Sequence, residues 1–537
     1  MSRARKTMLL TAFVMLAGGR SALAQPAAAP AGAAQPAAAP AQQRHFDVTE
    51  FRVDGNTVLT EIEIDKAVYG FLGPDKTAAD VEKARAALEA AYQAKGYPTV
   101  SAEVPVQRVA DGVVVLKVTE RTVGRVRVRG SQYHDLADIK AAAPSLKPGA
   151  VPHMPDLKHD IVALNQWPDR AVTPSLQAGA APDTVDVDLN VKDEFPGHAT
   201  LELNNRQSAD TTGLRLSGSL AYNNLWQRGD SATLNFQVAP ERPSDAEVVS
   251  GSYLFRIPDS DLSLLFSYLH SNSNVTTVGS TDVIGKGDIA GLRLLVPLGF
   301  GDGFMHALSM GFDYKHFDDD IALGATKTDA PVTYFPLTVA YNASWASEHA
   351  QTNLLASFVF TLSGPGSGPA AFDYARFEAS PGFAYLRTDL SRTQTLPDGI
   401  QFYGRITGQL TGQPLISNEQ FGLGGLDSVR GYLESEVLGD YGGALQTEMR
   451  TPPLTGMGWI TLNELRGLVF FDAGTAVLHD PLPQQRPSYV LTSAGIGVRM
   501  RLFDQLNGEV LVAFPLDDGT TTKAGDPRAL FRVYGDF

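Results

Sequence analysis

The residues best suited to specific polar binding lie in a glycine-rich connection, Pro414 to Ser435, in the last third of the chain. Within it stand four consecutive residues: Val429, Arg430, Gly431 and Tyr432. A guanidinium presents a planar fork of donors that binds a carboxylate through two hydrogen bonds, which lysine cannot match. The neighbouring glycines permit the tight turns that a loop tip needs in a confined space. This is the chemistry of a loop anchor and not of a catalyst.

A carboxylate lies downstream, on a segment that alternates like a strand. Strand parity places Phe470, Asp472 and Gly474 on one face, and Val469, Phe471 and Ala473 on the other. The second face is apolar and suits lipid, where a carboxylate would be costly. We therefore expect Asp472 to point into the interior of the structure that this strand builds.

Segments of alternating apolar and polar residues follow one another from about Ala199 to the end of the sequence. No stretch after the N-terminus is long and apolar enough for a membrane helix. Because every backbone group must be paired in lipid, such strands must close into a barrel. The predicted fold class is mainly β: a transmembrane antiparallel β-barrel of about sixteen strands over residues 195–537, preceded by two small domains.

The connections between these segments alternate in length. Short ones follow even-numbered strands, at residues 226–230, 258–260, 301–303 and 503–505. Long polar ones follow odd-numbered strands, at residues 271–287, 318–330, 364–369 and 517–528. Outer-membrane barrels have short periplasmic turns and longer external loops. The alternation therefore predicts an even number of strands, with both ends of the barrel sequence in the periplasm.

Two small domains precede the barrel and share one order of elements. Residues 45–121 show a strand, two helices and two further strands, with the helices expected over Glu61 to Phe71 and Asp80 to Lys95. Residues 122–194 repeat this order, and Val126 to Gly130 echoes Phe51 to Gly55. Ahead of them, residues 1–24 have the features of a secretory signal peptide. Residues 25–44 are rich in alanine and proline and predict an extended linker.

Composition excludes several classes of function. The net charge of -15 lacks the basic footprint of a nucleic-acid-binding protein. The absence of cysteine excludes disulfides, thiolate metal sites and cysteine nucleophiles. The ten histidines show no ligand spacing, and there is no nucleotide-binding glycine motif. We therefore expect no catalytic residue, no metal, no cofactor and no nucleic-acid partner.

The motif loop, the segment around Asp472 and the two preceding domains resemble, in this order, the transporter subunits of bacterial two-partner secretion systems. This is the hemolysin and filamentous-hemagglutinin secretion-activation family, and the two domains resemble its polypeptide-transport-associated (POTRA) domains. The likeness covers nearly all of the mature chain. In this family the motif loop folds inward and its arginine meets an aspartate on the barrel wall. The matching positions here are Arg430 and Asp472.

Two further positions bear on the resemblance. Phe537, a terminal aromatic residue on the last strand, resembles the sorting signal read by the barrel-assembly machinery. Relatives often begin with a helix that plugs the pore, whereas this sequence shows no convincing helix before Phe46. Whether a plug gates the pore is therefore left open by the sequence, and loop residues could do that work instead.

The resemblance implies a transporter in the bacterial outer membrane with its POTRA domains in the periplasm. It would capture an unfolded secreted partner, a large repeat-rich exoprotein, by adding a strand to a sheet edge. Export would proceed through the barrel without nucleotide hydrolysis, and the other expected partners are outer-membrane lipid and the barrel-assembly machinery. Two alternatives stay open. One is an assembly factor that inserts other membrane proteins; the other is a passive porin, against which the paired domains argue.

Overall fold

The computed structural model describes residues 44–109, 111–258, 260–273, 275–278, 281–301, 303–323, 326–362, 364–455 and 462–537. The signal peptide predicted over residues 1–24 and almost all of the linker predicted over residues 25–44 lie outside these ranges. Among the described residues, no helix combines the length and the apolar character needed to cross a membrane.

The first small domain contains a three-stranded sheet and two helices. The strands are β2 Glu50–Asp54, β4 Val100–Glu103 and β5 Val113–Glu120, in the order β2-β5-β4 with β2 and β5 parallel. The helices are α1 Glu61–Val68, followed by the 3-10 turn η1 Tyr69–Phe71, and α2 Ala78–Ala94. Two more strands, β1 Phe46–Val48 and β3 Gly73–Lys76, pair with each other and were not predicted. They are too short to show a period of two.

The second small domain repeats this arrangement. Its strands are β6 Thr122–Arg129, β7 Arg170–Ala178 and β8 Thr184–Asp193, in the order β6-β8-β7. Its helices are α3 Leu136–Ala141 and α4 Met154–Leu164, with the 3-10 turn η2 Pro144–Leu146 between them. The core brings together apolar residues of both helices and the sheet, among them Ile139, Leu157, Leu164, Val187 and Leu189.

Equivalent glycines follow the first sheet strand of each small domain. Gly55 has φ +93° and Gly130 has φ +88°, in the region that favours glycine. A Cβ at Gly55 would stand 2.4 Å from the carbonyl oxygen of Val118, and one at Gly130 would stand 2.5 Å from that of Val191. The sequence repeat therefore marks the point where the chain turns closely past a neighbouring strand.

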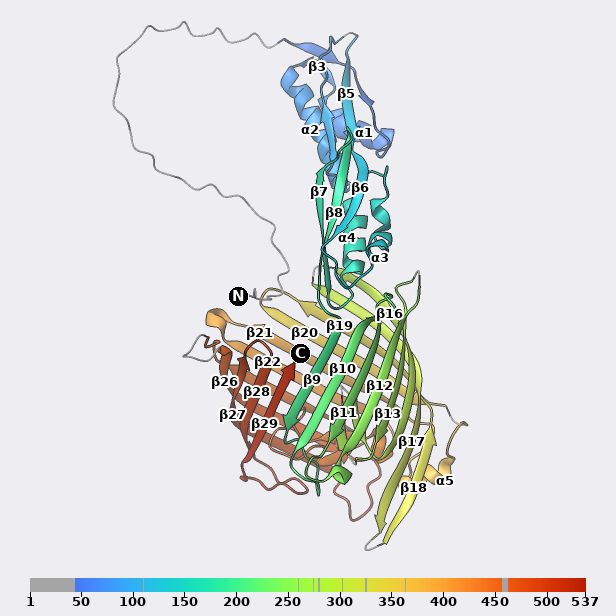
Figure 1. Ribbon diagram of the computed structural model, residues 1–537, viewed down its shortest axis with the longest axis vertical. Helices are drawn as coiled ribbons and strands as arrows, with labels where there is room; N and C mark the ends of the chain where they lie inside the picture. The colour runs from blue at the N-terminus through green and yellow to red at the C-terminus, as the bar shows by residue number, and fades with distance from the viewer. Residues whose placement is uncertain are drawn as a thin grey trace, which may run out of the picture. The chain divides into compact units, whose positions relative to one another are not determined.

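Among the described residues, sixteen antiparallel strands form a closed barrel (Figure 1). They are β9 Gly197–Asn204, β10 Arg215–Leu225, β11 Asp230–Val238, β12 Glu247–Arg256, β13 Ser263–Ser271, β16 Gly287–Gly301, β17 Phe304–Leu323, β19 Pro336–Ala346, β20 Ala350–Thr361, β21 Ala384–Thr395, β22 Gln401–Thr411, β25 Tyr441–Arg450, β26 Leu462–Val477, β27 Ser488–Leu502, β28 Leu506–Pro515 and β29 Arg528–Asp536. β29 pairs with β9 and closes the barrel. The predicted fold class is confirmed.

The two faces of the barrel wall differ in chemistry. Large apolar side chains are exposed on the outer face, including Leu220, Phe236, Phe312, Ile406, Val469 and Phe471. Residues of the opposite parity are buried and polar, including Asp313, Gln409, Glu448 and Asp472. Each strand thus presents one face to lipid and the other to the lumen, as period-two alternation requires.

The prediction for one of the long connections is wrong. Residues 318–330 were expected to form a long polar loop, but β17 continues to Leu323 and pairs with β18 Thr326–Tyr334 (Figure 1). The residues of this hairpin are largely polar and do not alternate with apolar ones, so the sequence pattern ends there. The backbone pairing between the two strands nevertheless continues. The long connection after β13 likewise contains a hairpin of β14 Val275–Val278 and β15 Thr281–Ile284. The connection after β20 contains the short helix α5 Pro369–Ala375.

Candidate functional site: a loop anchored inside the barrel

The connection between β22 and β25, residues 412–440, folds against the interior wall; we call it the lumen loop. It contains the 3-10 turn η5 Ser417–Glu419 and a small hairpin of β23 Phe421–Leu423 and β24 Val437–Gly439. An apolar cluster joins loop and wall; it comprises Phe421, Leu423, Val429, Tyr432, Val437, Ala444, Ala476 and Leu491. The last three belong to β25, β26 and β27. The loop is therefore packed onto the barrel and is not an external excursion.

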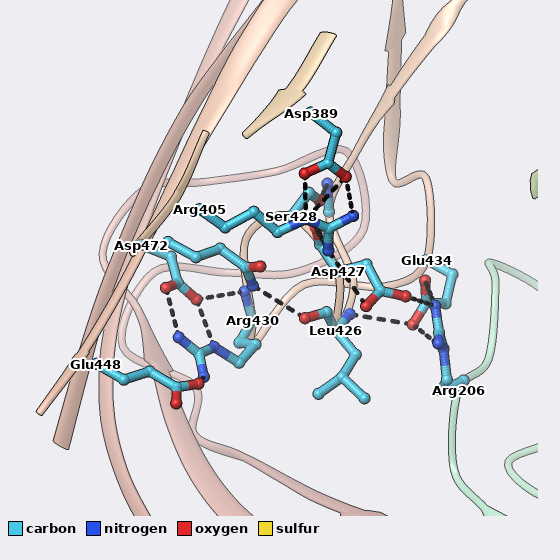
Figure 2. Close-up of polar contacts among 12 residues, drawn as sticks. Arg206, Asp389, Arg405, Leu426, Asp427, Ser428, Arg430, Glu434, Glu448 and Asp472 are labelled. Atoms are coloured by element: carbon cyan, nitrogen blue, oxygen red, sulfur yellow. Dashed lines mark hydrogen bonds and ion pairs between the residues drawn. The ribbon is translucent and has the colours of Figure 1, made fainter. Parts of the chain in front are cut away.

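Arg430 and Asp472 meet directly (Figure 2). Nε of Arg430 donates to Oδ2 of Asp472 at 2.7 Å, and Nη2 donates to Oδ1 at 2.7 Å. The backbone N–H of Arg430 also donates to Oδ2, at 3.1 Å. Arg430 is 2% exposed and Asp472 is 0% exposed. One residue thus supplies three hydrogen bonds to a fully buried carboxylate, in the two-pronged geometry that arginine provides.

Glu448 of β25 is a second buried carboxylate at this site. It contacts Nη1 of Arg430 and is 3% exposed. Nε of Arg450 donates to its Oε2 at 2.8 Å, and Nη2 of Arg499 donates to its Oε1 at 3.1 Å. The three guanidinium groups compensate the buried charge. Glu448 was not among the predicted site residues, although its strand neighbour Met449 is apolar and parity therefore points Glu448 inward.

Phe470 lies under the arginine. The guanidinium carbon of Arg430 stands 3.8 Å from the centroid of its ring, a cation–π contact. The ring is 5% exposed and shares the lumen face of β26 with Asp472. Arg430 is thus held by carboxylates at its edge and by an aromatic ring on its face.

Two glycines allow the loop to approach the wall. Gly431 has φ +98°, and a Cβ there would stand 3.1 Å from the Cβ of Ala513 on β28. A Cβ at Gly474 would stand 2.4 Å from Cδ1 of Leu423 and 3.2 Å from Cγ2 of Val429. Side chains at either position would separate loop from wall. The close approach explains why glycines stand in both the motif and the aspartate strand.

Tyr432 ties the lumen loop to β27 and to the connection between β28 and β29. Its hydroxyl lies 2.9 Å from the carbonyl oxygens of Thr492 and Asp517 and accepts from the N–H of Asp517 at 3.1 Å. The side chain is 1% exposed. Because Asp517 lies in the connection between β28 and β29, Tyr432 links the lumen loop to that external connection.

Acidic residues fix both ends of the lumen loop. Glu419 accepts hydrogen bonds from Nζ of Lys315 and from the hydroxyl of Tyr385, each at 2.6 Å. Glu436 accepts from the N–H and the hydroxyl of Thr522 at 2.7 and 2.5 Å. Burial tends to raise the pKa of Glu436, but the hydrogen bonds from Thr522 and neighbouring backbone groups hold it below its usual range. Glu436 therefore stays charged at neutral pH, and the hydrogen bonds of both carboxylates keep the loop ends in place.

Polar space remains beside the loop. A cavity of about 310 Å³ is lined by Arg405, Asp427, Arg430, Glu448 and Arg499, among others. A second cavity, of about 400 Å³, is lined by residues of β22, β25, β26, β27, β28 and β29, among them Arg466, Arg501 and Glu509. Among the residues that the structure describes, no group of three His, Cys, Asp or Glu side chains is placed to hold a metal ion. The arrangement binds and positions a loop beside polar cavities.

Phe537 lies at the seam where the barrel closes. Its N–H donates to the carbonyl of Ala199 at 2.9 Å, and its carbonyl accepts from the N–H of Ala199 at 3.0 Å. The residue is 68% exposed. Its use as a sorting signal stays a prediction.

Comparison with known proteins identifies the family. The haemolysin secretion/activation protein family ShlB/FhaC/HecB matches residues 183–500, and the ShlB-type POTRA domain matches residues 46–120. The chain belongs to the haemolysin secretion/activation protein family. The outer membrane transporter CdiB of Dickeya dadantii (strain 3937) is 23% identical over 413 residues, which are 75% of this chain and 72% of the relative. The heme/hemopexin transporter protein HuxB of Haemophilus influenzae (strain 86-028NP) is 22% identical over 489 residues, 89% of this chain and 85% of the relative.

Solved structures share the fold. CdiB from Escherichia coli superimposes with a TM-score of 0.69 at 19% identity, covering 92% of this chain and 91% of that chain. BamA from Haemophilus ducreyi lacking POTRA domains 1–3 gives a TM-score of 0.53 at 15% identity, covering 92% of this chain and 100% of that chain. The first of these shows the same fold over nearly the whole chain, a β-barrel preceded by small domains.

Membership in the ShlB/FhaC/HecB family establishes the broad function. The protein is a two-partner secretion transporter of the bacterial outer membrane, and its POTRA domains lie in the periplasm. The family transports secreted partner proteins. The resemblance that the sequence motifs indicated is confirmed.

Proposed function

We propose that the protein exports one unfolded partner, a large repeat-rich exoprotein, and that the lumen loop sets the state of the passage. The observation that carries this proposal is the contact of Arg430 with Asp472 and Glu448 inside the barrel. Removing one member of a buried ionic group leaves another charge uncompensated, so the position of such a loop is strongly determined. Val429, Gly431, Tyr432, Phe470 and Gly474 then act as its packing surface.

The two periplasmic domains would capture the unfolded partner protein. We propose POTRA domains over residues 45–121 and 122–194, after a signal peptide over residues 1–24 and a linker over residues 25–44. Each domain has a three-stranded sheet whose outer strands are β2 and β4, or β6 and β7. An extended cargo can add a strand at such an edge through backbone hydrogen bonds, with little demand on its sequence.

Export would need no enzyme activity. The sequence contains no Walker loop, so cargo folding and retention outside the cell would supply the free energy. The outward apolar band would contact outer-membrane lipid, and Phe537 would present the last strand to the barrel-assembly machinery.

One observation favours the alternative, insertion of other membrane proteins. The closing strands β9 and β29 share five residue pairs, from Arg532–Asn204 to Asp536–Thr200, and Phe537 with Ala199 adds a sixth, whereas β9 and β10 share eight. A shorter seam opens more readily. The family match nevertheless favours export of a secreted partner.

Reconstitution in lipid vesicles tests the proposal. The purified full-length protein is inserted into vesicles, and an unfolded repeat-rich exoprotein is added on the POTRA side. We expect the cargo to become protease-resistant inside the vesicles without any nucleotide, and added ATP to change nothing. Pre-folded cargo and empty vesicles are the controls. Protection that requires ATP, or insertion of barrel proteins without cargo export, would contradict the proposal.

A further inference from the structure

A second ionic cluster holds the tip of the lumen loop, away from Arg430. Asp427 lies three residues before the arginine and contacts two arginines from different parts of the barrel (Figure 2). Its Oδ2 accepts from Nη2 of Arg206 at 2.5 Å. Its Oδ1 lies 3.5 Å from Nη1 of Arg405, which also donates to the Asp427 carbonyl at 3.2 Å. One side chain therefore bridges two arginines.

Arg206 belongs to the edge of the closing seam. It follows β9, and its N–H donates to Oδ1 of Asn204 at 2.9 Å. The next residue back, Asn205, continues the seam by side-chain bonds: its Nδ2 donates to the carbonyl of Ala529 at 2.8 Å and its Oδ1 accepts from the N–H of Phe531 at 2.9 Å. Arg206 is thus fixed relative to both seam strands.

Glu434 is a second carboxylate of the loop that binds Arg206, beside Asp427. Nε of Arg206 donates to Oε1 of Glu434 at 3.0 Å, and the N–H of Glu434 donates to the carbonyl of Gln207 at 3.0 Å. Glu434 also accepts from the N–H of Leu426 at 3.1 Å, within the loop itself. The end of β9 and the loop tip are therefore tied by side chains and by backbone.

Arg405 ties the tip to another part of the wall. It projects from β22, and Oδ2 of Asp389 on β21 accepts from its Nη2 at 2.6 Å and from its Nε at 3.0 Å. In the barrel order, β25 to β29 lie between β22 and β9. Asp427 therefore bridges two points of the wall that have five strands between them, which requires the loop tip to reach across part of the lumen.

The two anchors of the loop differ in their exposure to water. At the Arg430 anchor, the side chains of Arg430 and Asp472 are 2% and 0% exposed. At the tip, the side chain of Asp427 is 48% exposed, and that of Arg206 is 17% exposed. Ion pairs that water reaches contribute little and are screened by salt, whereas buried pairs are screened much less. The contacts of Asp427 should therefore release first, while Arg430 and the less exposed Glu434, whose side chain is 16% exposed, stay bound.

We propose that Asp427 is a releasable latch: it fastens the tip of the lumen loop to Arg206 at the seam and to Arg405 on β22, and its release opens the passage while Arg430 remains the pivot. The proposal rests on the proposed function of the loop and adds how that loop is regulated. Arg206, Arg405 and Asp427 are positioning residues. Cargo entering from the periplasm would have to displace this half-exposed contact before the buried one.

Single-channel recording in planar bilayers tests the latch with Asp427→Asn, which removes the charge and keeps the shape. In the natural protein, the open probability should rise as KCl is raised from 0.1 to 1 M, because salt screens the exposed pairs. In Asp427→Asn it should already be about three- to tenfold higher at low salt and should respond weakly to salt. Arg206→Gln should act in the same direction.

Arg242→Gln is the matched control. Arg242 is an exposed arginine in the connection between β11 and β12, where it pairs with Asp245 at 2.5 Å and donates to the carbonyl of Asp210 at 3.3 Å, and neither partner belongs to the lumen loop. It should leave the recordings unchanged. If Asp427→Asn and Arg206→Gln behave like the natural protein while Arg430→Ala alters conductance, the latch is refuted and the proposed loop function stands. If Arg430→Ala also changes nothing, the proposed function itself is refuted.

Discussion

Replacing Arg430 with alanine is expected to reduce secretion of the partner protein at least about tenfold, because breaking a buried ionic group typically costs about 3–5 kcal/mol. The substitution leaves Asp472 and Glu448 buried without the guanidinium that joins them. The loop should then detach from β26, and open-pore conductance should rise. Secreted protein in the medium and single-channel conductance are the two measurements.

Arg430→Lys separates charge from geometry. Lysine keeps the positive charge but cannot donate to both oxygens of Asp472 in one plane. It should therefore restore only part of the secretion lost in Arg430→Ala. Heat-modifiable mobility on gels should show that both variants form folded barrels. Secretion and conductance at natural levels in Arg430→Ala would contradict the account.

Gly474→Val should impair secretion without changing any charge. A Cβ at this position would stand 2.4 Å from Cδ1 of Leu423 and 3.1 Å from the carbonyl oxygen of Gly443. Overpacking of this kind typically costs about 1–3 kcal/mol, which shifts loop docking by roughly five- to 150-fold. The loop should be displaced from the wall even though Arg430 and Asp472 are both intact.

Gly467→Val on the same strand is the matched control. A Cβ at Gly467 would meet nothing closer than Cγ2 of Thr451 at 3.5 Å, an ordinary contact. Gly467 also has the parity of the lipid-facing residues Val469 and Phe471, where valine is compatible with lipid. Equal secretion by Gly474→Val and Gly467→Val would show that close packing of the loop on β26 is unimportant.

Strand periodicity made much of the fold predictable. The alternation around Asp472 placed this residue on the face opposite Val469 and Phe471, and the structure puts it in the lumen with 0% exposure. The repeated glycines, Gly55 and Gly130, marked equivalent turns of the two small domains. These features depend on local spacing, which a single sequence displays.

Contacts between distant parts of the chain could not be predicted in this way. Arg206 lies 221 residues before Asp427, in a connection that shows no alternation of apolar and polar residues. No local sequence pattern therefore predicts their contact. The extension of β17 and β18 was missed because its pairing depends on backbone hydrogen bonds and not on an apolar face. The inward orientation of Glu448 could have been predicted, because its strand neighbour Met449 is apolar. Only the structure shows that Glu448 and Asp472 both bind Arg430.

The central claim, that the lumen loop rests on the inner wall at β26, can be tested by cross-linking in intact outer membranes. The protein contains no cysteine, so Leu423→Cys with Gly474→Cys introduces the only two thiols. Leu423→Cys removes the Cδ1 atom that a Cβ at Gly474 would meet at 2.4 Å, so the two thiols lie close together and should form a disulfide under mild oxidation. We expect the cross-linked protein to stop secreting and to resume after reduction. Absence of any cross-link in folded protein, or undiminished secretion by fully cross-linked protein, would contradict the account.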